Sequence, residues 1–201
     1  MNKTYIYKKR LKAVFLGASL SELEYGKMWY QLAQKEISGL DPNLAYVCGV
    51  TAILSPQKSW DINLYEAKKF IAQNSWAGIE LNYNIKEKLS LLNKTMTAKE
   101  IAKIVFGVNA IKTRDFFWSL YTGSGAVPVI DRHIYGAAGL NPDKTARTNK
   151  RTREIKRAIV ELSREFNLPA GIFQAVVWVA YREGILGNKR HEQKESVELP
   201  F

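Results

Sequence analysis

The stretch that decides the fold runs from Gly107 to Ile134 and has the sequence GVNAIKTRDFFWSLYTGSGAVPVIDRHI. Its first part predicts a tight loop that carries Lys112 and opens a helix over 112–121. Its last part predicts a second helix, which Asp131 heads as the N-cap residue. A Gly-Ser-Gly turn at 123–125 and an apolar Val-Pro-Val-Ile run lie between the two. The chain can therefore fold Lys112 and Asp131 onto one site.

The composition indicates a folded and basic protein. Of its 201 residues 46% are apolar and 24% are charged, which is enough for a sizeable core in one domain or in two lobes that share a cleft. Thirty Lys and Arg against nineteen acidic residues give a net charge of +11. This excess favours a polyanionic partner, most simply nucleic acid, over a basic protein without such a partner.

Several classes of protein are disfavoured by what the sequence lacks. Cys48 is the only cysteine, so neither an intrachain disulfide nor a cysteine-based zinc or iron–sulfur site is expected. Two histidines are too few for a metal cluster, and we expect no cofactor. There is no apolar run of membrane-spanning length and no signal peptide, which indicates a cytoplasmic, nucleoid-associated protein.

Apolar periodicity and capping residues predict roughly eight or nine helices with short connections and no β-pattern, hence an all-α fold. We expect helix starts at the capping box Ser21-Glu22-Leu23-Glu24, at Asp41-Pro42, at Ser59, at the capping box 97–100, at Asp131 and after Thr148. The run 127–130 is expected to be a short extended piece. A last helix begins after Pro169 and is expected to stop at Gly184.

Lys112 and Asp131 each have an ordinary and a chemical interpretation. A lysine in a loop is usually a solvated surface residue, but it can also bind a phosphate or, when desolvated, attack a sugar C1′ as a free amine. An aspartate that heads a helix usually only caps it, but in a cleft it can accept a proton or stabilise an oxocarbenium ion. Gln57 is an exposed loop residue or a wedge into a base stack. The basic segment 144–157 is a solvated face or a track for a phosphate backbone.

The order of these pieces resembles the helix-hairpin-helix (HhH-GPD) superfamily of DNA glycosylases, in particular its endonuclease III-like branch. The similarity covers about residues 44–183, and it also extends to a phage and bacterial offshoot of that superfamily. AYVCGVTAILSPQKSWDINLYEAKKF is similar to the family's early core helix, its Leu-Ser-x-Gln loop and the following helix. GVNAIKTRDFFWSL resembles the hairpin with its lysine, VPVIDRHI the Val-Asp-x-His segment, and PAGIFQAVVWVAYRE the closing helix.

The resemblance implies a two-lobed helical fold, with double-stranded DNA across the cleft and a nucleotide flipped into it. We expect one lobe over about 40–130, the other over about 1–39 and 131–187, and a polar tail over 188–201. Lys112 would be the nucleophile that releases a damaged or modified base and cuts the strand as an AP lyase. Asp131 would assist proton transfer and charge stabilisation, and Gln57 would fill the gap left by the base. The expected DNA contacts are Gln57, Lys58, Gly107, Asn109, Thr113, Arg114, Arg132 and His133, in a monomer.

The sequence departs from the family pattern at three places. The hairpin has Gly107-Val108-Asn109 where Gly-x-Gly is usual, the loop is one residue longer before Lys112, and the iron–sulfur cysteines are absent. Three alternatives therefore stay open. The first is a monofunctional glycosylase in which Asp131 activates water. The second is a non-catalytic DNA-binding protein of the same fold. The third is a phage-type accessory or interaction protein.

Overall fold

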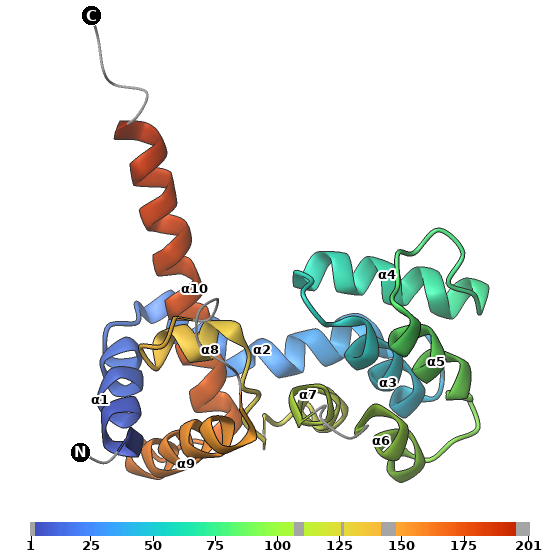
Figure 1. Cartoon of the computed structure of the whole chain (residues 1–201), viewed down its shortest axis with the longest axis horizontal. Helices are drawn as coiled ribbons and strands as arrows, with labels where there is room; N and C mark the ends of the chain where they lie inside the picture. Colours follow the sequence, from blue (N-terminus) through green and yellow to red (C-terminus); the bar gives the residue numbers. More distant parts are fainter. Residues whose placement is uncertain (1–2, 107–110, 126, 142–147, 196–201) are drawn as a thin grey trace, which may run out of the picture. The chain divides into compact units, whose positions relative to one another are not determined.

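The computed structural model describes residues 3–106, 111–125, 127–141 and 148–195, the last eleven of these by their backbone alone. The described residues form ten α-helices and no strand, which confirms the predicted all-α fold (Figure 1). The helices are α1 (Lys3–Leu16), α2 (Leu20–Ser38), α3 (Leu44–Leu54), α4 (Trp60–Gln73), α5 (Tyr83–Leu91), α6 (Ala98–Phe106), α7 (Ile111–Thr122), α8 (Arg132–Ala137), α9 (Asn149–Glu165) and α10 (Ala170–Glu195).

The helices belong to two compact units. We call Met1–Trp29 with Ile130–Phe201 the terminal unit and Tyr30–Val129 the central unit. The sequence predicts lobes over about 40–130 and over 1–39 with 131–187, whereas the central unit begins at Tyr30, within α2. The central unit is one continuous stretch of chain, and the terminal unit is built from both ends of the chain.

The terminal unit packs α1, α8, α9 and α10 around one apolar core (Figure 1). Helix α1 contributes residues spaced four apart, which therefore share one face of the helix: Tyr7, Leu11 and Phe15. The ring of Phe15 stacks on that of Phe173 in α10, with 4.6 Å between the centroids. Helix α9 adds Ile155, Ala158, Ile159 and Leu162. This apolar face fixes which side of α9 points outward.

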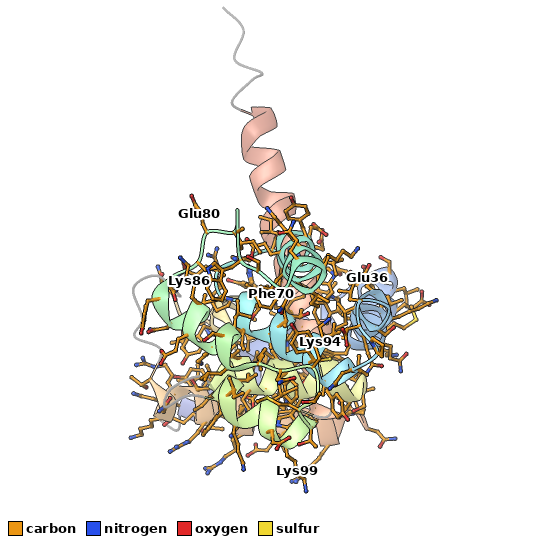
Figure 2. The ribbon with its side chains drawn as sticks, turned by 90° about the vertical axis from the view of Figure 1, so that its right-hand side faces the viewer. Glu36, Phe70, Glu80, Lys86, Lys94 and Lys99 are labelled. Carbon is orange, nitrogen blue, oxygen red and sulfur yellow. The ribbon has the colours of Figure 1, made fainter. Side chains whose placement is uncertain are left out.

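The central unit is built around α3. Its sequence LAYVCGVTAIL is apolar nearly all round, and every residue from Ala45 to Leu54 is buried among α4, α5, α6 and α7. A side chain at Gly49 would meet Ile101 of α6 at 2.6 Å, so glycine permits the close approach of these two helices. Figure 2 shows Phe70 on the inner side of α4, whereas Glu80 and Lys99 point away from the unit.

Most predicted helix starts are confirmed. Ser59 accepts the N–H of Ile62, and Thr148 accepts that of Arg151. Thr97 and Glu100 form the expected capping box, in which the Thr97 N–H donates to the Glu100 carboxylate at 2.8 Å. The run 127–130 lies outside any helix, and no strand occurs in the described part of the chain.

Two predicted helix starts are wrong by two residues. The capping box of α2 is Ser19 with Glu22, because the Ser19 N–H donates to Glu22 Oε2 at 2.6 Å. The N-cap of α3 is Asn43, whose side chain accepts the N–H of Tyr46. Asp41 instead pairs with Lys94, with 2.7 Å between Oδ2 and Nζ. In each case neighbouring residues offer the same capping chemistry, and tertiary contacts select between them.

The predicted end of the last helix is also wrong. Helix α10 continues through Gly184 to Glu195, and it includes residues 188–195 of the expected polar tail. Nothing lies within 4 Å of a Cβ added at Gly184, and its backbone stays helical. A glycine inside a helix costs only about 1 kcal/mol relative to alanine, which the helix formers on either side offset.

Candidate functional site

The predicted hairpin lies between α6 and α7, two helices that pack against each other in the central unit. Gly107 and Asn109, expected to contact DNA, lie outside the described residues. Lys112 and Thr113 occupy the first turn of α7, and both are partly buried. The sequence therefore places the lysine correctly at the start of a helix.

Side chains from three helices hold the two ends of this hairpin. The Arg114 guanidinium lies 4.7 Å from the centre of the Phe106 ring, the last residue of α6. The same guanidinium donates to Oδ1 of Asp115 at 3.1 Å, and Asp115 is only 1% exposed. On the other side, Lys88 of α5 donates through Nζ to the carbonyl of Val105 at 3.2 Å. Arg114, an expected DNA contact, thus also joins α6 to α7.

The ammonium of Lys88 lies near the hairpin and is affected by burial. Desolvation lowers the pKa of Lys88, and the carboxylate of Glu87 opposes that shift. A cation at the last turn of α6 is favourable because carbonyl groups point toward it there. This contact is not predictable from the sequence, because a lysine on an amphipathic helix is normally solvated.

Gln57 lies in the loop between α3 and α4 and is exposed, as predicted. Its φ is +63°, in the left-handed region that a residue with a side chain seldom adopts. Such a conformation costs of order 1–2 kcal/mol for a residue with a Cβ. The loop therefore presents an exposed polar side chain from a residue whose backbone is strained.

Lys58, the neighbour of Gln57 and another expected DNA contact, forms an ion pair with Glu66 of α4. The side chains are only 17% and 13% exposed, so the pair is shielded from water. The Lys58 charge is largely compensated within the central unit. A phosphate that binds here has to compete with Glu66.

Asp131 heads helix α8 in the terminal unit. Its Oδ1 accepts the N–H groups of His133 at 3.0 Å and Ile134 at 2.9 Å, so it caps α8 as predicted. Its Oδ2 accepts the indole N–H of Trp178 in α10 at 2.9 Å. Three donors from two helices therefore fix the carboxylate in one orientation. The sequence does not predict the Trp178 contact, although the N–H of a partly buried indole usually finds an acceptor.

Aromatic and cationic side chains surround the indole of Trp178, which binds this carboxylate. The ring of His133 meets Trp178 edge-on with 6.1 Å between centroids, and the Arg182 guanidinium lies 5.1 Å from the same indole. The ring of Trp29 also packs against that indole, with 5.6 Å between the centroids. Arg132, the first residue of α8, is exposed, and His133 is partly buried. Arg132 and His133, both expected to contact DNA, thus follow Asp131 directly in the first turn of α8.

The two expected catalytic residues belong to different units. Lys112 is part of the central unit, and Asp131 is part of the terminal unit. The geometry above is that of each residue within its own unit. That the two side chains share one site stays a prediction.

Metal and membrane features are absent from the described part of the chain. No cluster of three or more His, Cys, Asp or Glu side chains in that part has the arrangement of a metal site. Within the same residues, no helix combines the length and apolar character needed to cross a bilayer.

A protein-family model described as "Family of unknown function (DUF7178)" matches residues 2–185. The chain belongs to this family. No curated protein and no solved structure is significantly similar to it. The matched residues include helices of both units.

Proposed function

We propose that this protein is a DNA glycosylase that excises a damaged or modified base and cuts the strand as an AP lyase. The observation that carries the proposal is the oriented carboxylate of Asp131, held by three N–H donors at the start of α8. It is supported by the resemblance of the sequence to helix-hairpin-helix glycosylases and by the net charge of +11. Double-stranded DNA is the proposed partner.

In this proposal Asp131 acts mainly through its fixed negative charge. Cleavage of an N-glycosidic bond develops positive charge on the sugar ring, which a carboxylate on one face stabilises. A preoriented charge avoids reorganisation at the moment of reaction. Because both carboxylate oxygens already accept hydrogen bonds, this electrostatic role requires less rearrangement than activation of a water molecule.

Lys112 supplies the nucleophile. Its neutral amine attacks C1′, the C1′–N bond breaks, and the base leaves with the bonding electrons and takes up a proton. The resulting amine at C1′ loses a proton and opens the sugar to an imine. Loss of a C2′ proton then expels the 3′ phosphate by β-elimination, which cuts the strand.

Borohydride trapping tests this sequence of steps on a panel of duplexes that carry damaged and modified bases. We expect a covalent protein–DNA adduct that is lost in Lys112→Gln and retained in the matched control Lys103→Gln, an exposed lysine of α6. An adduct that persists in Lys112→Gln overturns the lysine assignment. Base release that survives Lys112→Gln but not Asp131→Asn indicates the monofunctional enzyme.

Gln57 provides a second test of the same proposal. The Gln57→Gly variant removes the side chain and relieves the left-handed strain, so stability is expected to stay equal or to rise slightly. If the side chain fills the space of a flipped nucleotide, base release from duplex DNA falls while release from single strands is unchanged. An equal loss on both substrates contradicts the wedge role.

A non-catalytic DNA-binding protein is the second candidate, and one observation favours it. The hydrogen bonds of Asp131 fully account for its presence as a helix cap tied to Trp178, without any chemistry. Salt-sensitive binding of DNA without base release from any oligonucleotide of the panel would select this alternative.

A further inference from the structure

The exposed cations of helix α9 lie on one side of the helix. Its four exposed cations are Lys150, Arg153, Arg157 and Arg164. At 100° per residue they fall within about 60° of arc, centred roughly opposite the buried residues Ile155, Ile159 and Leu162. The cations therefore form one stripe on the outward side of the helix, which we call the α9 stripe.

The acidic residues of α9, Glu154, Glu161 and Glu165, lie to one side of this stripe, and the last two form ion pairs within the unit. Glu165 pairs with Lys12 of α1, and Glu161 lies 3.6 Å from the ammonium of Lys8. Within the described part of the chain no ion pair joins an acidic residue to any of the four stripe cations. Among these described residues the four stripe cations are thus not held in ion pairs, although Glu154 and Glu161 lie one helical turn from Lys150 and Arg157. On the α1 side of the helix, Glu161 and Glu165 are paired with lysines.

We infer that the α9 stripe binds the phosphate backbone of double-stranded DNA. From Lys150 to Arg164 the stripe extends about 21 Å along the helix, at about 1.5 Å per residue, which spans several phosphates of a duplex. Three of its four cations are arginines, whose planar guanidinium can bind a phosphate through two N–H groups. This surface deepens the proposed function, on which it rests for the identity of the nucleic acid.

The remaining surface of α9 distinguishes a duplex from other anionic partners. No large hydrophobic side chain of α9 is among the exposed ones in the described residues, because its apolar face is buried in the core. An anionic membrane is usually bound through apolar side chains that enter the lipid beside the cations. Single strands are usually bound through aromatic side chains that stack on the bases, and α9 presents none. The α9 stripe therefore has the cations that bind a phosphate backbone but lacks the apolar and aromatic side chains that bind lipid or unpaired bases.

The stripe is tested by removing charge from it and, separately, from elsewhere. The variant Arg153→Gln/Arg157→Gln/Arg164→Gln is compared with Lys27→Gln/Lys35→Gln/Lys68→Gln, three exposed lysines of α2 and α4. Both variants lose three positive charges. Fluorescence anisotropy measures the affinity for an undamaged duplex, for the same sequence as a single strand, and for phosphatidylserine vesicles over a series of NaCl concentrations. Circular dichroism verifies that each variant is folded.

We expect the stripe variant to lose about tenfold or more in duplex affinity and the slope of log K against log[NaCl] to fall by about 2–3, with the control variant changed far less. Equal losses in the two variants, or a wild-type protein that does not bind duplex, overturn the inference. A stripe-dependent affinity that is greater for vesicles or single strands also overturns it.

The same measurements separate this inference from the proposed enzyme. Stripe-dependent duplex binding without base release from the damaged panel leaves the stripe standing and refutes the glycosylase. Base release with equal affinities of the two variants refutes the stripe and leaves the glycosylase standing.

Discussion

At the scale of single residues, Asp131 combines two tasks that mutations can separate. Its Oδ1 caps α8, and its Oδ2 ties that cap to Trp178 of α10. The cap was predictable because an aspartate before a helix is a local signal. The link to Trp178 was not, because it joins residues 47 positions apart through the tertiary fold.

We predict that Asp131→Ala lowers the free energy of unfolding by about 2 kcal/mol, since it removes the cap and leaves the Trp178 N–H without its acceptor. Asp131→Asn keeps a capping oxygen but places an amide NH2 against the Trp178 N–H, so it costs about 1–2 kcal/mol. Ser59→Ala, which removes a cap without a second partner, is the matched control and costs about 1 kcal/mol. Urea denaturation measures all three. Additive losses for Asp131→Ala and Trp178→Phe in the double variant would contradict the coupling of the two residues.

Asp41 gives a prediction on pH. The hydrogen bond from Lys94, and next the N–H of Asn43, lower the pKa of Asp41 below its usual value. A lowered pKa in the folded state stabilises the protein above the unfolded pKa, near 4, and this contribution is lost as the pH falls through the folded pKa. We therefore expect Asp41→Asn to lose less stability than the wild type between pH 5 and pH 3.

Urea denaturation at both pH values tests this expectation. Asp61→Asn removes an exposed carboxyl of α4 that has no ion pair in the described part of the chain, and it serves as the control. Parallel pH profiles for wild type and Asp41→Asn would show that the Lys94 pair does not contribute to acid stability.

At the scale of helices, the sequence predicts which segments form helices better than it predicts the residues at which those helices begin and end. Ser19-x-x-Glu22 and Ser21-x-x-Glu24 are overlapping capping boxes, and the local sequence does not distinguish them. Asn43 displaces Asp41 as the cap of α3 because its Nδ2 also donates to the carbonyls of Lys94 and Met96. These contacts come from a segment about fifty residues away, beyond the reach of a local pattern.

Two glycines inside helices have opposite expected roles. A Cβ at Gly26 of α2 would lie 2.6 Å from the Cα of Val176, so the backbone of α2 or α10 would have to shift. Gly26→Ala is therefore expected to destabilise by about 1–3 kcal/mol despite its better helix propensity. Gly184→Ala meets nothing within 4 Å and is expected to stabilise α10 by up to about 1 kcal/mol. Thermal unfolding of both variants tests these expectations. Equal changes of the Tm in the two variants would contradict the close contact at Gly26.

At the scale of the whole molecule, the two units differ in how the chain builds them. The central unit uses only Tyr30–Val129, whereas the terminal unit needs α1 from one end of the chain and α8–α10 from the other. The sequence indicates all-α character through periodicity, but periodicity does not report which distant helices pack together. For example, periodicity does not predict that α1 packs against α9, a contact that includes the ion pair of Lys12 with Glu165.

This topology predicts an order of folding. Contacts within the central unit close shorter loops, so they cost less chain entropy than the contact of α1 with α9. In pulsed hydrogen exchange we expect amides of α3, α6 and α7 to gain protection before those of α1 and α9. Earlier protection of α1 and α9 would contradict this order.

Cys48 has a practical consequence for all of these experiments. It lies inside α3 with 0% exposure, and burial raises the pKa of its thiol to about 12. At neutral pH the thiol therefore stays protonated, and its sulfur is also shielded from reagents. In a variant with a cysteine introduced on the surface, such as Lys68→Cys, a maleimide dye is therefore expected to react with the introduced cysteine and not with Cys48. The natural protein thus allows a single fluorophore to be attached at a chosen site without first removing a native thiol.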